Sequence, residues 1–244
     1  MTTVLSLGGS IVAPEAPDHE FVASFVGLAA EHLERDEARR LIVVVGGGGP
    51  ARRWQGAYRE IVARLPAIAA HAPPDAARLA EAEAQDWIGI MATRLNAQLV
   101  KAALGGLCPQ EVVVDPSAVT IFRGRALVAA GWKPGFSTDY DAVLLAERFG
   151  ANRVLNLSNI EKVYTDDPRK NPAARPIDAI SWADFRSLVG DEWVPGKNAP
   201  FDPIASKKAA ELGLQVICAA GKDLANLRAI LEGGKFVGTV IGPR

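Results

Sequence analysis

Two glycine-rich loops are the segments of this chain best suited to binding phosphate. Gly8, Gly9 and Ser10 follow a short apolar run over residues 4–7, and four consecutive glycines at 46–49 follow an apolar, valine-rich run over 41–45. A glycine loop between a strand and a helix lets backbone N–H groups approach an anion, and the helix N-terminus adds partial positive charge. Glycine also simply permits tight turns, so one loop alone is weak evidence. Two loops predict a polyphosphate or two phosphate-bearing ligands, although neither has Walker A or dinucleotide-fold spacing.

Several basic residues could complete such a site. Arg52 and Arg53 follow the second loop, inside a predicted first helical turn, and a planar guanidinium matches phosphate geometry. A solvated surface pair is the alternative interpretation. Lys207 and Lys208 follow Asp202 on a later helix, where adjacent side chains point about 100° apart, so at most one of the two lysines faces a given site. Lys197 is interpreted as a surface residue rather than a second phosphate ligand.

Polar residues also follow the spacing of one helix face. Asp86, Gly89, Thr93 and Asn96 are separated by three, four and three residues, so they share one side of a predicted helix. Such a face could meet a sugar or a partner subunit, and the alternative is helix packing with Asp86 as an N-cap. A second polar group, residues 137–139, stands at the start of another predicted helix, where N-capping explains one of its three members.

The composition excludes several classes of protein. The chain has 244 residues, of which 49% are hydrophobic, enough for a sizeable core, yet no apolar run approaches the ~18 residues of a membrane span. The 27 basic and 28 acidic residues nearly balance, which argues against a broad nucleic-acid or membrane surface. The first residues lack signal-peptide features, and Cys108 and Cys218 form neither a disulfide framework nor a metal pair. We therefore expect a cytoplasmic globular protein with no resident metal site.

Alternating strands and helices position these residues. Strands are expected over 4–7, 41–45, 112–114, 126–129, 154–157, 215–219 and 238–241, and helices over 21–33, from 51, and over 75–104, 139–149, 182–189, 204–212 and 224–231. That order predicts an α/β fold with a mainly parallel sheet sandwiched by helices. Ligands of such sheets bind at the carboxyl ends of strands, where both glycine loops fall.

Seven stretches together resemble the amino acid kinase family and, within it, the UMP kinases of archaeal type. The matching stretches are 5–10, 44–52, 86–97, 134–139, 163–168, 202–207 and 238–241, in family order along essentially the whole chain. The glycine loops are shared by the whole family. The helix that carries Asp86 and the loop over 137–139 are more specific to UMP kinases.

The resemblance implies a carbamate kinase-like fold and the ATP-dependent phosphorylation of UMP to UDP, with Mg²⁺, in pyrimidine nucleotide biosynthesis. One domain would hold UMP in residues 1–150 and ATP in residues 151–244, and the chain would assemble as a homo-oligomer, a hexamer. Carried over by position, the catalytic residues would be Gly9, Ser10, Asp139 and Lys207. UMP would contact Gly47, Gly48 and Arg52 through its phosphate, Asp86 through its ribose and Thr138 through its base, and ATP would contact Gly8, Gly9, Ser10, Asn159, Tyr164, Asp167 and Lys207.

Two positions depart from the family pattern. Ser6 stands where many members have lysine, which points to the archaeal subtype. Lys162 stands where glycine is usual; it would be strained if φ is positive there, or its ammonium could help to hold ATP phosphates. Alternatives to UMP kinase are a family enzyme with another acceptor, such as isopentenyl phosphate, carbamate or an amino acid, and a non-catalytic protein that binds a nucleotide or oxyanion. The combination of Arg52, Asp86 and Thr138 favours a nucleotide acceptor.

Overall fold

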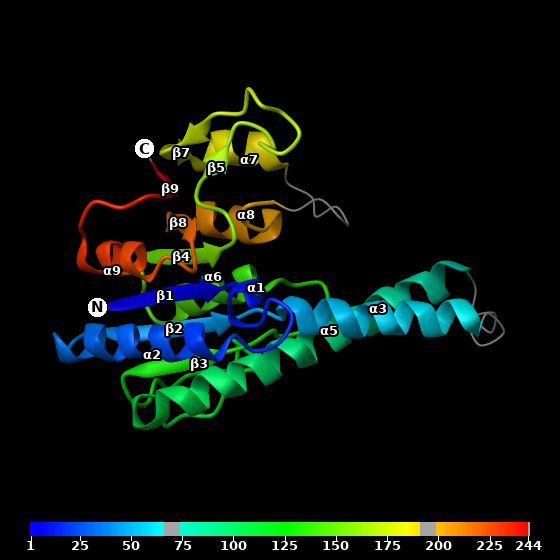
Figure 1. Ribbon diagram of the computed structural model, residues 1–244, viewed down its shortest axis with the longest axis horizontal. Coiled ribbons are helices and arrows are strands. Elements are labelled where there is room, and N and C mark those ends of the chain that lie inside the picture. Colours follow the sequence, from blue (N-terminus) through cyan, green and yellow to red (C-terminus); the bar gives the residue numbers. More distant parts are fainter. Residues whose placement is uncertain (66–73, 191–198, 244) are drawn as a thin grey trace.

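The computed structural model describes residues 1–65, 74–190 and 199–243, which build a seven-stranded sheet between two layers of helices (Figure 1). The strands in spatial order are β3 (Ala126–Ala129), β2 (Arg40–Val45), β1 (Thr2–Leu7), β4 (Arg153–Ser158), β8 (Gln215–Ala220), β9 (Thr239–Gly242) and β7 (Ala179–Ser181). Neighbours are parallel except β8 and β9. A separate antiparallel pair joins β5 (Val163–Tyr164) to β6 (Pro176–Ile177). The predicted α/β fold with a mainly parallel, sandwiched sheet is confirmed.

Each face of the sheet packs against its own hydrophobic core. One core joins the sheet to α2 (His19–Glu34), α5 (Pro74–Leu104) and α9 (Leu224–Glu232). The other joins it to α6 (Thr138–Arg148), α7 (Trp182–Val189) and α8 (Pro203–Glu211). Strands buried on both faces have near-continuous apolar runs, which is why residues 41–45 lack the alternation of a half-exposed strand. The central position of β1 between β2 and β4 places both glycine loops in the middle of the carboxyl edge.

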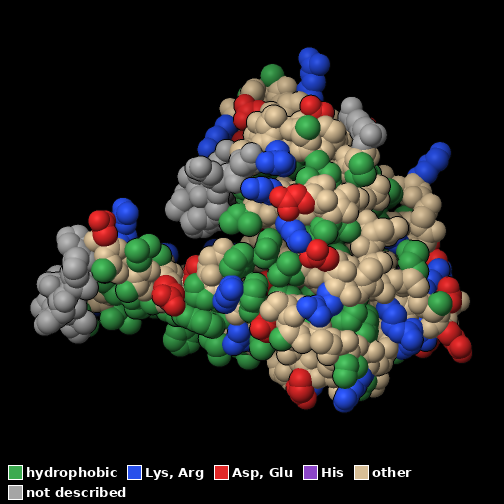
Figure 2. Space-filling model, turned by 180° about the vertical axis from the view of Figure 1, so that it is seen from behind, with side chains coloured by type: hydrophobic (Ala, Val, Ile, Leu, Met, Phe, Trp, Pro, Cys, Tyr) green, Lys and Arg blue, Asp and Glu red, His purple; other side chains and the backbone are tan. Residues whose placement is uncertain are grey.

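Two helices extend beyond the sheet as an arm. α3 (Gly48–Arg64) runs outward and α5 returns beside it (Figure 1). Large apolar side chains are exposed along both helices and at the C-cap of α3: Trp54, Ile61, Leu65, Leu79, Trp87, Met91, Leu95 and Leu99. Figure 2 shows hydrophobic side chains gathered along this arm and its junction with the body. Leu95 is 70% exposed, which is unfavourable in water, so this face is suited to burial against another surface.

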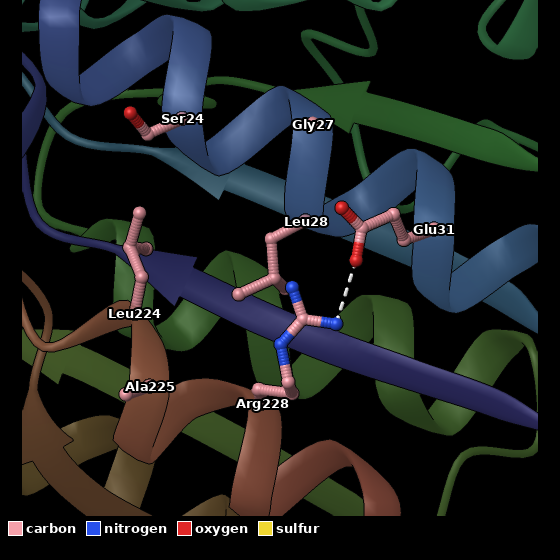
Figure 3. A pocket seen from close by; sticks show the side chains of 7 residues that line it. All are labelled: Ser24, Gly27, Leu28, Glu31, Leu224, Ala225 and Arg228. Carbon is pink, nitrogen blue, oxygen red and sulfur yellow. Dashed lines mark ion pairs between the residues drawn. The ribbon is translucent and has the colours of Figure 1, made fainter.

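Ion pairs connect α2 to α9, which come from opposite ends of the chain. Glu31 and Arg228 meet at 2.7 Å across a hollow of about 460 Å³ (Figure 3). Nearby, Glu232 accepts from Arg39 at 2.8 Å and lies 3.0 Å from the imidazole of His32. Arg39 and then His32 lower the pKa of Glu232 to about 2, so Glu232 is ionised at neutral pH. None of the predicted site residues lines this hollow.

Most predicted elements are confirmed, and three differences have local causes. The strand expected over 112–114 is wrong: only Val113 makes an isolated bridge, to Ala129, because Pro109 and Pro116 flank this run and restrict its backbone. The helix expected from residue 51 begins at Gly48. β5, β6 and β7 were not expected, since runs of two or three residues carry no periodicity. No helix in the described ranges is both long and apolar enough to span a bilayer.

Candidate functional site

The two glycine loops lie against each other with no room for side chains between them. A Cβ on Gly9 would lie 2.1 Å from the Gly48 nitrogen, and a Cβ on Gly48 would lie 2.3 Å from the Gly9 oxygen. Gly48 also has φ +63°, a conformation that favours glycine. Gly9 begins the short helix α1 (Gly9–Val12), and Gly47 caps α3. The glycines are therefore required both for the turns and for the close approach of two helix N-termini at neighbouring strand ends.

Arg52 connects these two loops. Its guanidinium donates to the Ser10 hydroxyl at 3.1 Å and to the Pro14 carbonyl at 3.1 Å. It borders a cavity of about 240 Å³ whose lining residues are Pro14, Glu15, Gly49, Arg52 and Arg53. Arg53 instead pairs with Glu15 at 2.9 Å on the surface, with 60% of its side chain exposed. Arg52, and not Arg53, is therefore placed to contact a ligand bound by both loops.

The polar face of α5 holds the backbone of two loops. Asn96 donates its amide to the carbonyls of Gly46 at 2.9 Å and Gly47 at 3.1 Å. The Thr93 hydroxyl accepts from the Gly131 N–H at 2.8 Å, and the Asp86 carboxylate accepts from the Gly135 N–H at 2.9 Å. Because α5 begins at Pro74, Asp86 is not an N-cap, and that part of the alternative interpretation is wrong, whereas the buried Thr93 and Asn96 do pack this face against its neighbours. The shared helix face is confirmed, and it joins the second glycine loop to residues 131–137.

Residues 131–137 form a tethered loop that ends at α6. Ser137 is the N-cap of α6, accepting from the Tyr140 N–H at 3.2 Å, and Thr138 is the first helical residue. The rings of Trp132 and Phe136 lie 5.4 Å apart and those of Phe136 and Tyr140 stack at 4.8 Å. Gly135, which contacts Asp86, lies three residues before Thr138. One loop therefore connects Asp86 and Thr138, the residues predicted to bind the ribose and base of the acceptor.

Asp139 lies beneath the first glycine loop. Its carboxyl accepts from the Ser6 hydroxyl at 2.8 Å and from the Asp202 N–H at 3.2 Å. Burial raises the pKa of Asp139 to about 6, against the opposing effect of these hydrogen bonds. Asp202 caps α8 by accepting from the Ala205 N–H at 2.8 Å. Asp139 therefore joins β1, α6 and the start of the helix that carries Lys207.

The two lysines of α8 have different surroundings. Lys208 pairs with Glu147 of α6 at 2.9 Å. Lys207 is exposed and has no ion pair or side-chain hydrogen bond within the described part of the chain. The structure agrees with the expectation that at most one of them is available to a ligand, and Lys207 is the available one.

The predicted ATP nucleoside contacts are less connected. Asn159 is exposed after β4, Tyr164 lies in β5, and Asp167 pairs with Arg169 at 3.1 Å. No hydrogen bond or ion pair in the described ranges joins Tyr164 or Asp167 to the glycine loops. Their roles therefore remain predictions.

Lys162 is neither strained nor free. No non-glycine residue in the described ranges has positive φ, so the strain considered for this position is absent. Its ammonium pairs with the carboxylate of Asp178, which raises the pKa of Lys162 and occupies the group that was considered for ATP phosphates. Lys197 lies outside the described residues.

Arg94 and Asp141 were not among the predicted site residues, although both contact the loop over residues 131–137. Arg94 donates to the Trp132 carbonyl at 3.0 Å, and Asp141 accepts from the Trp132 N–H at 3.2 Å. The available signals were a charged residue directly after Thr93 and a carboxylate within the apolar side of a helix. Both act on backbone atoms of Trp132, which lies 38 positions from Arg94 and outside the helix that carries Asp141, so no helical or strand periodicity reveals either contact.

The chain is similar to known proteins over most of its length. The amino acid kinase family model matches residues 1–220. A uridylate kinase of Methanospirillum hungatei is 36% identical over 98% of this chain and 94% of its own. A uridylate kinase of Pyrococcus abyssi is 32% identical over the full length of both chains. The crystal structure of a uridylate kinase from Archaeoglobus fulgidus has a TM-score of 0.79 and 30% identity, covering 99% of this chain and 100% of that one.

Proposed function

This chain belongs to the amino acid kinase family, and we propose that it phosphorylates UMP to UDP with ATP as donor. It is a nucleoside monophosphate kinase, a phosphotransferase whose acceptor is itself a phosphate. The observation that carries the proposal is the Arg52–Ser10 contact at 3.1 Å between two phosphate-suited loops whose backbones touch. Two phosphate groups held by these loops would be neighbours, as phosphoryl transfer between them requires.

The acceptor half of the site comprises residues 1–150. The N–H groups of Gly47 and Gly48 and the guanidinium of Arg52 would bind the UMP phosphate, because helix N-termini and arginine forks suit anions. Asp86 would accept from ribose hydroxyls, and Thr138 would contact uracil. The tether between Asp86 and Gly135, at 2.9 Å, supports placing sugar and base against one loop.

The donor half comprises residues 151–244 together with the first glycine loop. Gly8, Gly9 and Ser10 would cradle the transferred phosphoryl group, and Lys207 would reach the β- and γ-phosphates. Asn159, Tyr164 and Asp167 would flank the ATP nucleoside. The free ammonium of Lys207 and the link from Asp139 to the start of α8 support this arrangement.

The chemistry asked of the protein is mainly alignment and charge neutralisation. The UMP phosphate is already a nucleophile, so no strong general base is needed. Phosphoryl transfer depends on in-line positioning and on cations around the equatorial oxygens, and glycine N–H groups, Arg52 and Lys207 provide both. Asp139 accepts from Ser6 and from the Asp202 N–H, and the proposed reaction asks no proton abstraction of it.

The kinase reaction uses ATP with a divalent metal ion, and we propose Mg²⁺ bound with ATP. No group of three histidine, cysteine or acidic side chains in the described ranges could hold a metal ion. In this proposal the metal ion arrives with the nucleotide, and phosphate oxygens are its main ligands. When bound, the metal would neutralise charge on the transferred group.

We also propose a homo-oligomer, a hexamer, in the cytoplasm. The exposed apolar face of α3 and α5 provides the surface for contact between copies. Both cysteines are free and buried, as suits a reducing compartment.

The testing experiment is ADP release with ATP and Mg²⁺ against UMP, CMP, dUMP, AMP, GMP and isopentenyl phosphate. We expect turnover with UMP far above the other acceptors. Preference for another acceptor would retain the fold and refute the substrate, and no turnover with bound ATP would favour a binding protein.

A further inference from the structure

A carboxyl group is buried in the apolar layer beneath residues 131–137. Asp141 is completely buried on α6, whose other buried residues include Ala142, Val143 and Leu145. Its Oδ2 accepts from the Trp132 N–H at 3.2 Å, and its Oδ1 has no hydrogen-bond partner in the described ranges. Burying a carboxyl group with one partner is unfavourable relative to an apolar side chain. An apolar residue at this position could not accept the hydrogen bond from the Trp132 N–H, so this bond is what Asp141 adds.

Trp132 is held through both of its backbone polar groups. Its N–H donates to Asp141 on α6, and its carbonyl accepts from Arg94 on α5 at 3.0 Å. Its ring packs against Phe136, and the Lys133 ammonium lies 3.9 Å from the Trp132 ring centroid. The beginning of the loop is thus fixed between two helices that lie on opposite faces of the sheet.

The other end of the same loop carries the acceptor contacts. The Gly135 N–H meets Asp86 at 2.9 Å, and Ser137 caps α6 directly before Thr138. Gly135 follows Trp132 by three residues in the same short loop. We therefore expect a shift of the Trp132 backbone to move Gly135 as well. The position of Trp132 therefore bears on the residues proposed to meet ribose and base.

We propose that Asp141 is a positioning residue for the acceptor nucleotide: it holds the Trp132 N–H from inside the core, so that the loop over residues 131–137 keeps Gly135 on Asp86 and leads into Thr138 in the arrangement that UMP requires. The proposal rests on the proposed function and deepens it. Asp141 does not touch the substrate, so it acts through the loop. Its loss therefore changes the KM for UMP and leaves the KM for ATP and the kcat nearly unchanged.

The test compares two substitutions with a packing control in the full-length enzyme. Asp141→Val removes the acceptor and fits an apolar layer, and Asp141→Asn keeps an oxygen that accepts from Trp132. We expect Asp141→Val to raise the KM for UMP about tenfold, as for the loss of one hydrogen bond of ordinary to strong character. Asp141→Asn should stay within about twofold of wild type on the same grounds. Leu145→Ala, at another buried position of α6, should lower the melting temperature without this selective KM change.

Other results overturn the proposal. An unchanged KM for UMP in Asp141→Val does so, as does an equal KM rise in Leu145→Ala, which would indicate general loosening of α6. Should Asp141→Val not fold, Arg94→Met removes the other backbone tether of Trp132 and is expected to show the same split. Hydrogen exchange across 131–137 gives a readout independent of turnover: faster exchange in Asp141→Val than in Asp141→Asn is expected, and equal exchange contradicts the tether. Wild-type enzyme without UMP turnover refutes the proposed function instead.

Discussion

The Ser6 hydroxyl donates a 2.8 Å hydrogen bond to the Asp139 carboxyl, joining the central strand to α6 beneath the first glycine loop. Ser6 occupies the position where many family members have lysine. Here the carboxyl has a neutral partner, and burial raises its pKa to about 6. The protonation state of Asp139 therefore changes within a range of pH that is easily measured.

Ser6→Ala should move the acidic limb of the kcat–pH profile to higher pH. The hydrogen bond from Ser6 lowers the pKa of Asp139, so its removal raises that pKa further. We expect activity to require the ionised form of this carboxyl group, which lies beneath the first glycine loop. Thr3→Val, at another buried polar position of β1, is the control. A limb at the same pH in Ser6→Ala and wild type would contradict this role.

Arg52→Ala should raise the KM for UMP strongly and leave the KM for ATP nearly intact. A charge-assisted hydrogen bond contributes roughly 1.5–3 kcal/mol, which corresponds to about 10- to 100-fold. Arg53→Ala is the matched control, because Arg53 pairs with Glu15 on the surface. Steady-state kinetics with each substrate varied provides the measurement. Equal losses for UMP and ATP would show that Arg52 does not belong to the acceptor half.

Lys207→Ala should lower kcat far more than it weakens UMP binding. Its ammonium is free of ion pairs in the described structure, whereas Lys208 is held by Glu147 at 2.9 Å. Lys208→Ala is therefore the control, with an expected small effect on stability. Single-turnover rates and UMP titration separate the two quantities. A large loss of kcat in Lys208→Ala and a small one in Lys207→Ala would show that Lys208, not Lys207, contacts the phosphates.

Asp141→Asn should flatten the dependence of folding stability on pH. Burial first, then the like charges of Asp139 and Asp115, raise the pKa of Asp141 from its ordinary value of 3.8 to about 7. The native state thus binds the proton more tightly, so stability falls as pH rises between about 4 and 7. Each pKa unit corresponds to about 1.4 kcal/mol, which is readily measured. The free energy of unfolding in urea should differ less between pH 5 and pH 8 for the variant than for wild type. The difference that remains in the variant would come from Asp139. An equal difference in both proteins would contradict the role of Asp141 in this pH dependence.

Leu95→Glu should dissociate the proposed homo-oligomer. Leu95 is 70% exposed on the apolar face of α5, and a charge there opposes burial against another copy. Ile121→Glu, at a position 53% exposed outside the arm, is the control and should leave the assembly intact. Light scattering after size exclusion measures the mass. A monomeric wild type, or an oligomer unaffected by Leu95→Glu, would exclude this face as an interface.

The predictable part of the fold is the part dictated by local patterns. Apolar runs such as 41–45, buried on both faces, marked the parallel strands, and the glycine loops after them marked the carboxyl edge. β7 has only three residues and pairs with β9, about 60 positions later in the chain. Its formation therefore depends on a contact that no local pattern shows. The run over 112–114 was apolar enough for a strand, but its neighbouring prolines restrict the backbone.

The same division applies to the site. Arg52 was predictable because it lies within one turn of its loop, and the polar face of α5 followed from helical spacing. The Ser6–Asp139 contact joins residues 133 positions apart, and Asp141 reaches the backbone of a residue outside its own helix. Such contacts depend on the packing of α6 against β1, which no local pattern specifies.

The contact between Gly9 and Gly48 also has a consequence for sequence drift. The space between the two backbones is smaller than one methyl group, so neither position tolerates even alanine. A side chain at either glycine would overlap the backbone of the other. Gly27, where a Cβ would meet nothing within 4 Å, is under no such restriction, although it is the same residue type. In a saturation library, the open space around each glycine α-carbon would therefore predict its tolerance to substitution, and Gly9 and Gly48 would be among the least tolerant because a side chain has no volume to occupy there.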